Sequence, residues 1–515
     1  MSAERPWKIY LAAIAIICLL VGVGVGWVVK PAKAPEGWVP PEEYEAMEKE
    51  VTMYEYLTKY YEFVSSTTPS GMVSTLKEAE TPWGSIWDMV SSGWPGVEEY
   101  DPDVEAQNVE IYKQWLTEIL GKPPEEVTGT LVVAAWAGLG RENETWWNNG
   151  PWGFKNIFPN VEIQWKYFED EPVLRAQLEM DPEWADIMEV CGSQWKLILD
   201  GYLSPIDPSL VPLLAEFAPE WLLHFSFWYD NQLYGVCFEY GQTSMAYRVD
   251  IFEELGIFDK YPQYFEDETL VDLAGFLCAD IPELEGKIWV YDSVIEVLDL
   301  GIEYLTGAKG VTMPMYIEWT LDSEKFEAAK EAMYLVKPKI GKFFTGVEEA
   351  YGALQSGEAA AVIAWNDVFA AASLGPDWRP GTGDEVPVKW AVVHSDWGSA
   401  YTINSRLLET KGFDLWVAAH AFLNAVSAPE AHATKISEWL YGAPNRYAWD
   451  LAIQWWEEWG IEEAGEEGWG AVLEEILAEA GISDVHFMAV ECVYWMEIPD
   501  EIVRPWEEFW LEYKA

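Results

Sequence analysis

From residue 129 onward, short apolar segments alternate with segments of helical periodicity, and no other feature of this sequence restricts its fold as strongly. Thr130–Ala137 (TLVVAAWA) and Val161–Phe168 (VEIQWKYF) have the length and composition of buried strands. Glu171–Met180 is predicted to be a helix, followed by a short strand at Asp186–Val190 and a second helix at Ser193–Asp200. Strands that alternate with helices in this way predict an α/β sheet covered by helices.

The alternation of predicted strands and helices continues towards the C-terminus. Further strands are predicted at Leu233–Phe238, Met245–Arg248, Ile288–Tyr291, Ala359–Trp365 and Lys389–Val393. Helices dominate from Phe413 to the end, apart from an aromatic, strand-like segment at Val485–Trp495. The length allows two to four domains with a large core.

The composition excludes two classes of protein. The 31 Lys and Arg residues against 88 Asp and Glu residues give a formal net charge of −57, which excludes binding to the phosphates of nucleic acids. Half of the residues are hydrophobic, so the chain is not a disordered acidic polymer. The 32 tryptophans are the second unusual feature, because exposed indole rings stack on sugars or hold cations over their faces.

The N-terminal segment predicts the compartment. Arg5 and Lys8 precede Ile9–Val29, an uncharged apolar segment long enough to span a bilayer. Ala32-Lys33-Ala34 has the pattern of a signal-peptide cleavage site, but Pro35 follows it directly and disfavours cleavage. We therefore expect an uncleaved anchor with the bulk of the chain on the extracellular face of the membrane. A removed signal, which would leave the protein secreted, stays open as the alternative.

A Pro- and Gly-rich linker at 31–43 follows this segment. Mostly apolar residues then recur at alternating spacings of three and four: Tyr44, Met47, Val51, Tyr54, Thr58 and Tyr61. This spacing predicts one helix with a narrow apolar stripe. The helix packs either on its own domain or as a short stalk or oligomer contact. The glycosylation sequence Asn143-Glu144-Thr145 agrees with an exterior location.

Six passages further along the chain occur in a familiar order. They are DIMEVCGSQWKLILDGYLSPID (186–207), LYGVCFEYGQTSMAYRVDIF (233–252), LEGKIWVYDSVIEVLDLGIEYLTG (284–307), SGEAAAVIAWNDVFAAA (356–372), WGSAYTINS (397–405) and YGAPNRYA (441–448). In this order they resemble the periplasmic or extracellular solute-binding proteins of ABC importers, most closely the spermidine/putrescine-binding branch. The resemblance extends from about residue 128 to residue 450.

The resemblance implies a two-lobed α/β fold of the periplasmic-binding-protein type (type II), with hinge crossover strands and a ligand cleft between the lobes. It also implies an ABC permease as partner, to which the captured solute is delivered. The expected organisation is an anchor or signal at 1–35, a helical, stalk-like extension at 36–128, a first lobe at 129–240 with part of 366–405, and a second lobe at 241–365 with the helical 406–515.

Polar and aromatic residues gather just past the predicted strands, where open α/β sheets bind their ligands. With the resemblance, they give these candidate ligand-binding residues: Trp136, Trp195, Glu239, Tyr240, Thr243, Asp292, Glu296, Trp365, Asp367, Trp397 and Asn445. A box of rings with two or three carboxylates suits a polyamine, since rings hold the chain and carboxylates neutralise its ammonium groups.

Several of these residues have a purely structural alternative. Asp367 is placed to cap the helix that follows it, and Trp365 to fill the core at a strand end. Asp292 is a second possible cap, and Glu239 is expected to be an exposed charge. Gly138 and Leu139 stand where the family has an acidic residue and a tyrosine. Trp195 stands near the second strand–helix turn, where the family has another tyrosine. These departures leave an oligosaccharide or a bulkier organic cation open as the ligand.

No catalytic or metal-binding motif is present, so we expect neither a cofactor nor an enzyme. The histidines, at 224, 394, 420, 432 and 486, lack metal spacing, and no serine-triad, zinc or phosphate-loop motif occurs. Cys191, Cys237, Cys278 and Cys492 allow one or two disulfides without fixing their pairing. A surface-assembly protein that has lost its ligand is the remaining alternative to a solute receptor.

Overall fold

The computed structural model describes residues 58, 62 and 65–515, with gaps at 63–64, 93–99, 138–140, 170, 192–193, 225, 376–379, 381–384, 392–394, 465–467 and 480–499. Within these residues, no helix has the length and apolar character needed to span a membrane. The predicted N-terminal anchor, almost all of the helix expected between Tyr44 and Tyr61, and the segment Val485–Trp495 lie outside the described residues.

One sheet of eleven strands organises the described part of the chain from Phe63 onward. Its path is β12-β11-β13-β8-β15-β5-β3-β4, with β6, β7 and β14 paired beside this path. The bounds are β3 Gly129–Trp136, β4 Val161–Phe168, β5 Ile187–Val190, β6 Leu203–Ser204, β7 Phe227–Tyr229, β8 Gln232–Arg248, β11 Ile288–Tyr291, β12 Ile340–Phe344, β13 Ala361–Trp365, β14 Val388–Trp390 and β15 Ser395–Asn404. The α/β class predicted from the alternation is confirmed.

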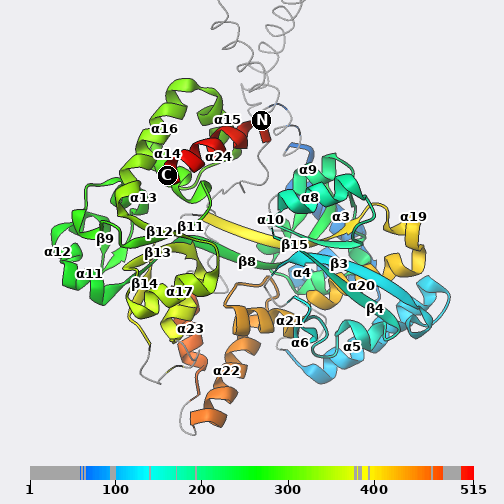
Figure 1. Cartoon of the computed structure of the whole chain (residues 1–515). Coiled ribbons are helices and arrows are strands. Elements are labelled where there is room, and N and C mark those ends of the chain that lie inside the picture. The colour runs from blue at the N-terminus through cyan, green and yellow to red at the C-terminus, as the bar shows by residue number, and fades with distance from the viewer. Residues whose placement is uncertain are drawn as a thin grey trace, which may run out of the picture. The chain divides into compact units, whose positions relative to one another are not determined.

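The pairing divides the sheet into two parallel ends joined by two antiparallel strands. β3 lies parallel to β4 and β5, and β11 lies parallel to β12 and β13. Between these ends, β8 pairs antiparallel with both β13 and β15 (Figure 1). We call the elements around β3–β5 the first lobe and those around β11–β13 the second lobe. β8 and β15 are the crossover strands.

The long strand β8 differs from the prediction of two separate strands at Leu233–Phe238 and Met245–Arg248, because it runs without a break through Gly241. It continues through this glycine because Gly241 lies against other side chains. A Cβ there would lie 2.3 Å from the ring of Trp397 and 2.8 Å from Oδ1 of Asn366. The glycine thus marks a close approach of neighbouring elements and not a turn.

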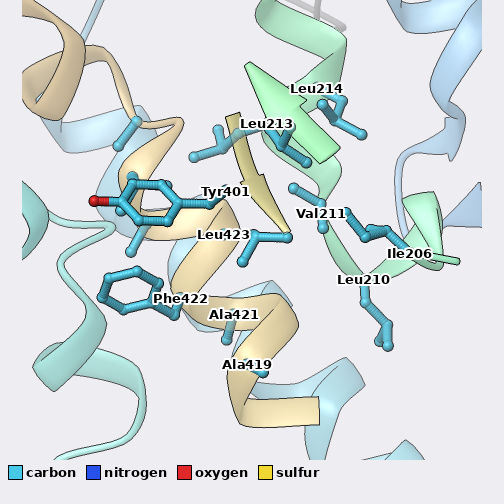
Figure 2. Close-up of a cluster of buried hydrophobic side chains, with 14 of the residues drawn as sticks. Ile206, Leu210, Val211, Leu213, Leu214, Tyr401, Ala419, Ala421, Phe422 and Leu423 are labelled. Carbon is cyan, nitrogen blue, oxygen red and sulfur yellow. The ribbon is translucent and has the colours of Figure 1, made fainter. Parts of the chain in front are cut away.

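The first lobe has a core that draws on widely separated parts of the sequence. Figure 2 shows Leu213 and Leu214 beside Tyr401 of β15 and Phe422 of helix α20. The helices of this lobe are α3 Pro69–Glu78, α4 Ile86–Ser92, α5 Pro102–Leu120, α6 Glu144–Trp147, α7 Phe154–Ile157, α8 Glu171–Met180, α9 Gln194–Leu199, α10 Pro219–His224, α19 Leu407–Lys411, α20 Phe413–Val426 and α21 Pro429–Thr434.

Two of the expected domain boundaries differ from this arrangement. Leu76 of α3 and Tyr112 of α5 are buried in the same core as Leu131 of β3, so 65–128 is a part of the first lobe and not a stalk. Phe422 of α20 is buried there too, although 406–515 was expected in the second lobe. The reason is that these helices bury apolar faces that only the sheet end of the first lobe covers.

Local sequence signals explain where the helices of both lobes begin and end. Asp101 caps α5 by accepting the N–H groups of Asp103 and Val104, and Gly121 ends this helix with a φ of 69°. The second lobe contains α11 Val249–Leu255, α12 Ile257–Lys260, α13 Leu273–Cys278, α14 Ile295–Thr306, α15 Met313–Leu321, α16 Ser323–Val336, α17 Val347–Ser356 and α18 Asn366–Leu374. The C-terminal helices are α22 Ala448–Ala464, α23 Gly470–Glu479 and α24 Asp500–Lys514.

A short π-helix, η7 Lys435–Trp439, follows α21 and leads into a third connection. It ends at Leu440, a buried residue with a φ of 57° in the left-handed region. Gly442 then exchanges two backbone hydrogen bonds with Tyr240 of β8, each 2.9 Å long. π-Helical turns and left-handed non-glycine residues concentrate at functional sites. This connection is therefore a candidate part of the functional site.

The cysteines in the described residues form no disulfide. Cys191, Cys237 and Cys278 are buried thiols, whereas Cys18 and Cys492 lie outside the described residues.

Candidate functional site

Five aromatic side chains gather with Cys191 into one apolar group, which we call the aromatic cluster: Trp136, Trp365, Trp397, Trp439 and Tyr441. Trp397 and Tyr441 are buried and meet edge to face, with their ring centroids 5.0 Å apart. The other three tryptophans are half-buried. Three of the five, Trp136, Trp365 and Trp397, are residues that the sequence predicted to bind ligand.

The members of the aromatic cluster come from both lobes and from the connections between them. Trp136 is the last residue of β3, and Trp365 is the last residue of β13. Trp397 lies on the crossover strand β15, while Trp439 ends η7. The carboxyl ends of strands from opposite ends of the sheet therefore face a common group of rings, as expected for ligand sites of open α/β sheets.

One carboxylate adjoins these rings. Asp367, half-buried in the first turn of α18, forms a side-chain hydrogen bond with the hydroxyl of Tyr441. Its Oδ1 also accepts the N–H of Val368 at 2.8 Å. Burial raises the pKa of Asp367 to about 7, although the bond from Tyr441 acts in the opposite direction. No ion pair links Asp367 to a cation anywhere in the described residues.

The expectation that Asp367 caps its helix is wrong, because the helix begins one residue earlier. Trp365 occupies the cap position without a side-chain capping bond. Asn366, the residue between them, is fully buried and ties two connections together. Its Oδ1 accepts the N–H of Gln242 on β8 at 2.9 Å, and its Nδ2 donates to the carbonyl of Leu440 at 2.6 Å.

A buried group of four charges lies next to the aromatic cluster, and we call it the charge quartet: Arg141, Glu189, Glu239 and Lys435. Arg141 donates to Glu189 at 2.9 Å and also to Glu239, while Lys435 lies 3.4 Å from Glu239. Both cations stack on Trp439, with Lys435 Nζ 3.2 Å and Arg141 Cζ 4.4 Å from its ring centroid.

Glu239 was expected to be an exposed charge, and the structure contradicts this. It is 2% exposed. Burial acts to raise the pKa of Glu239, but Arg141 and Lys435 outweigh burial and hold it below its ordinary value. Glu239 is thus an ionised partner inside the charge quartet and contributes no unpaired carboxylate to the aromatic cluster.

The two other predicted residues of β8 are buried as well. The backbone of Tyr240 pairs with Gly442, and its ring occupies the space where a side chain at 442 would lie. Thr243 stands opposite Trp365 in the register of β8 and β13. Both residues support the aromatic cluster from the crossover strand.

Two predicted residues have partners away from the aromatic cluster, and a third is buried in helix α14. Asp292 is bound by α24, through an ion pair with Lys514 at 2.6 Å and a 2.9 Å hydrogen bond from the indole of Trp510. Asn445 is fully buried and donates to Glu216 at 2.6 Å. Glu296 is buried near the start of α14. Their contacts place Asp292 and Asn445 outside the candidate site.

Trp195 lies on α9, the helix that follows strand β5 of the first lobe. Among the residues that the prediction missed, Tyr441 stands in the quoted passage YGAPNRYA, where Asn445 was selected instead. Arg141 and Lys435 are rare cations in a strongly acidic chain, and this scarcity is the signal that could have indicated paired, buried positions.

A separate cavity of about 300 Å³ lies in the first lobe and shares no residue with the aromatic cluster. It is lined by Glu142, Glu144, Trp147, Lys155, Glu162, Ile163 and Trp165. Because it touches neither crossover strand, it is not part of the candidate site.

Comparison with known protein families gives a decisive match. The family described as bacterial extracellular solute-binding protein matches residues 154–463, more than half of the chain and all of the aromatic cluster except Trp136. The chain belongs to this family. The predicted resemblance is therefore confirmed, and the members of this solute-binding family serve transport and are not enzymes. No match was found among curated protein sequences.

Solved structures of substrate-binding proteins are similar at low identity. A spermidine/putrescine ABC transporter substrate-binding protein of Streptococcus pneumoniae has 16% identity and a TM-score of 0.48, covering 75% of this chain and 99% of its own. A putative spermidine/putrescine ABC transporter protein of Listeria monocytogenes has 17% identity and a TM-score of 0.49, with coverage of 75% and 99%. A binding protein of A. tumefaciens B6 in complex with glucopine has 18% identity and a TM-score of 0.43, with coverage of 68% and 92%. The family assignment rests on the sequence match and not on these structures.

Proposed function

We propose that this extracellular solute-binding protein captures a small organic cation, of the polyamine kind or another amine, in the aromatic cluster. The observation that carries the proposal is Asp367, a carboxylate without a cationic partner in the described residues that lies beside indole and phenol rings. Rings and a carboxylate at one place are the two groups that recognise a cation.

The energies of these contacts suit reversible capture. A cation over a ring face gains about 0.5–2 kcal/mol, with the larger value at desolvated sites. A charge-assisted hydrogen bond or ion pair with Asp367 adds roughly 1.5–3 kcal/mol. Two or three rings and one carboxylate together contribute roughly 2.5–9 kcal/mol before the cost of association, so a captured cation is released again readily.

In this proposal the protein delivers the cation to an ABC permease and carries out no chemistry on it. Trp136 and Trp365 belong to opposite lobes, so a bound cation holds the lobes together by hinge closure about β8, β15 and the connection after η7. Residues 9–29 serve as the tether that keeps the receptor at the extracellular face of the membrane.

Thermal unfolding of the full-length protein tests the proposal. Putrescine, spermidine and methylated amines are each added at millimolar concentration, with glucose, maltose and neutral amino acids as comparison ligands. We expect at least one amine to raise the melting temperature, because a ligand that binds only the folded state stabilises it. A response to sugars alone, or to none of these compounds, contradicts the proposal, and the second outcome favours a surface-assembly protein.

Two variants connect the response to the aromatic cluster. Trp365→Ala and Asp367→Asn should each reduce the affinity for the amine about tenfold or more. The matched controls are Trp459→Leu and Asp280→Asn, since both residues are exposed and lie outside the aromatic cluster. Equal loss of binding in the controls would show that the effect is not specific to this site.

A further inference from the structure

We propose that the ligand is a compact ammonium ion with a single charge and a methylated nitrogen, and not a linear polyamine. This inference rests on the proposed function and specifies its ligand class. It follows from the bonding partners of the carboxylates and of the hydrogen-bond acceptors around the aromatic cluster.

Among the described side chains, four buried or half-buried carboxylates lie at or next to the aromatic cluster, and three of them have other partners. Glu189 and Glu239 are bonded to Arg141 within the charge quartet. Glu171 is 1% exposed and accepts the backbone N–H of Cys191, which belongs to the cluster. Of these four, only Asp367 is bonded just to a phenol and a backbone N–H, so the described side chains supply one unpaired negative charge.

A polyamine needs at least two such charges, one for each ammonium group. The sequence predicted Glu239 and Asp292 for this purpose, but Glu239 is balanced by Arg141 and Lys435, and Asp292 by Lys514. Recruiting either carboxylate would leave a buried or half-buried cation without its partner, which is costly. Among the described side chains, a second ammonium group therefore finds no unpaired counter-charge at the aromatic cluster.

The hydrogen-bond inventory points to a methylated nitrogen. A primary ammonium carries three N–H donors, and each donor needs an acceptor once water is removed. The cluster side chains offer indole rings, which accept no conventional hydrogen bond, besides one phenol and the carboxylate of Asp367. Asn366, which lies between Trp365 and Asp367, already uses both ends of its amide for Gln242 and Leu440. A fully methylated, quaternary ammonium has no N–H donors to satisfy and gains its energy from ring faces and a single counter-charge.

Isothermal titration calorimetry of the full-length protein at pH 8 tests this inference. The probes are tetramethylammonium, putrescine and spermidine as chloride salts, with sodium chloride at equal ionic strength as the blank. We expect one tetramethylammonium ion per chain, with a Kd at least tenfold lower than that of either polyamine. The Asp367→Asn and Trp365→Ala variants should each raise this Kd at least tenfold, while Trp459→Leu leaves it within twofold.

The other outcomes separate the two claims. Binding of putrescine or spermidine that is tighter than tetramethylammonium, or weaker by less than tenfold, overturns the inference but leaves organic-cation capture intact. Tetramethylammonium binding that is unchanged in both cluster variants places the cation elsewhere and also overturns the inference. Failure of all three probes to bind overturns the inference together with the proposed function. Circular dichroism of each variant identifies any loss that is due to unfolding.

Discussion

At the scale of single residues, burial and charge oppose each other at Asp367. Burial raises its pKa to about 7, while the hydroxyl of Tyr441 stabilises its ionised form in part. A carboxyl group in this state is half-protonated near neutral pH when the site is empty. A bound cation favours the ionised form, so ligand binding and proton release are linked.

This linkage predicts a pH dependence of binding. The charge of tetramethylammonium does not change with pH, so its affinity should be constant above about pH 8. Well below pH 7 the affinity should decrease by up to about tenfold for each unit that the pH falls. Calorimetric titrations between pH 5.5 and 8.5 measure this. In Asp367→Asn the remaining affinity should be low at every pH, and a parallel pH profile in this variant would assign the titration to another group.

A second buried carboxyl predicts a pH dependence of stability. Glu430 is 5% exposed and accepts the hydroxyl of Tyr100, and burial raises its pKa from 4.5 to about 7. Because the folded state then binds a proton that the unfolded state releases, the contribution of Glu430 is present below about pH 4.5 and lost as the pH rises through 7. Glu430→Gln should therefore stabilise the protein by about 3 kcal/mol at pH 8 and hardly at all at pH 4.5.

Urea unfolding of this variant and its parent at the two pH values measures the difference. Burial lowers the pKa values of the buried histidines His420 and His432 to about 4 and about 3, so they affect stability in the opposite sense. Their contribution is the same in the variant and in its parent and therefore cancels in the difference. The exposed Glu125→Gln is the control, with no change expected at either pH. A destabilised Glu430→Gln at pH 8 would contradict the assignment.

At the scale of elements, Asn366 connects α18 to the crossover strand β8 and to the end of η7. Its amide satisfies a backbone N–H on one side and a backbone carbonyl on the other, both within the buried part of the connection. The left-handed Leu440 and the close approach of Gly241 occur at the same place. The elements that position the aromatic cluster are therefore fixed by a few specific contacts.

Asn366→Ala should lower the free energy of unfolding by roughly 2–4 kcal/mol, because it leaves two buried backbone groups without partners. Urea denaturation measures the change. Asn160→Ala, which removes one exposed hydrogen bond to the carbonyl of Glu125, is the matched control and should change stability by less than about 1 kcal/mol. A cost equal to that of the control would show that the amide of Asn366 does not hold the connection.

The C-terminal helix α24 provides a second prediction at this scale. Asp292→Ala removes its ion pair with Lys514 and the acceptor of Trp510, so hydrogen exchange in α24 should become faster. The affinity for the cation should stay within twofold of the parent, since Asp292 has its contacts with α24. A tenfold loss of affinity would return Asp292 to the ligand site that the sequence predicted.

At the scale of the whole molecule, the sequence predicted strands and their ends better than tertiary partners. β4 and β11 have the predicted bounds, and Trp365 with Asp367 lies at the predicted joint between strand and helix. Local patterns and strand-end chemistry suffice for these features. The continuation of β8 through Gly241 was missed because the sequence does not show what lies against a glycine.

Glu239 and the 65–128 segment were misjudged for a related reason. Glu239 is 98 residues from Arg141 and 196 residues from Lys435 along the chain, so its burial depends on partners that no local pattern reveals. The helices of 65–128 look self-contained in sequence, yet their apolar faces are buried only against the first lobe. Pairing over such separations is a property of the folded molecule.

The central claim is that one cation binds where rings from both lobes surround a single carboxylate. The most direct measurement is the calorimetric Kd for tetramethylammonium at pH 8 in the parent protein and in Trp365→Ala, with Trp459→Leu alongside. The account predicts one ion per chain and a Kd at least tenfold higher in Trp365→Ala than in the parent or the control. Equal affinity in all three proteins, or no binding by the parent, would contradict it.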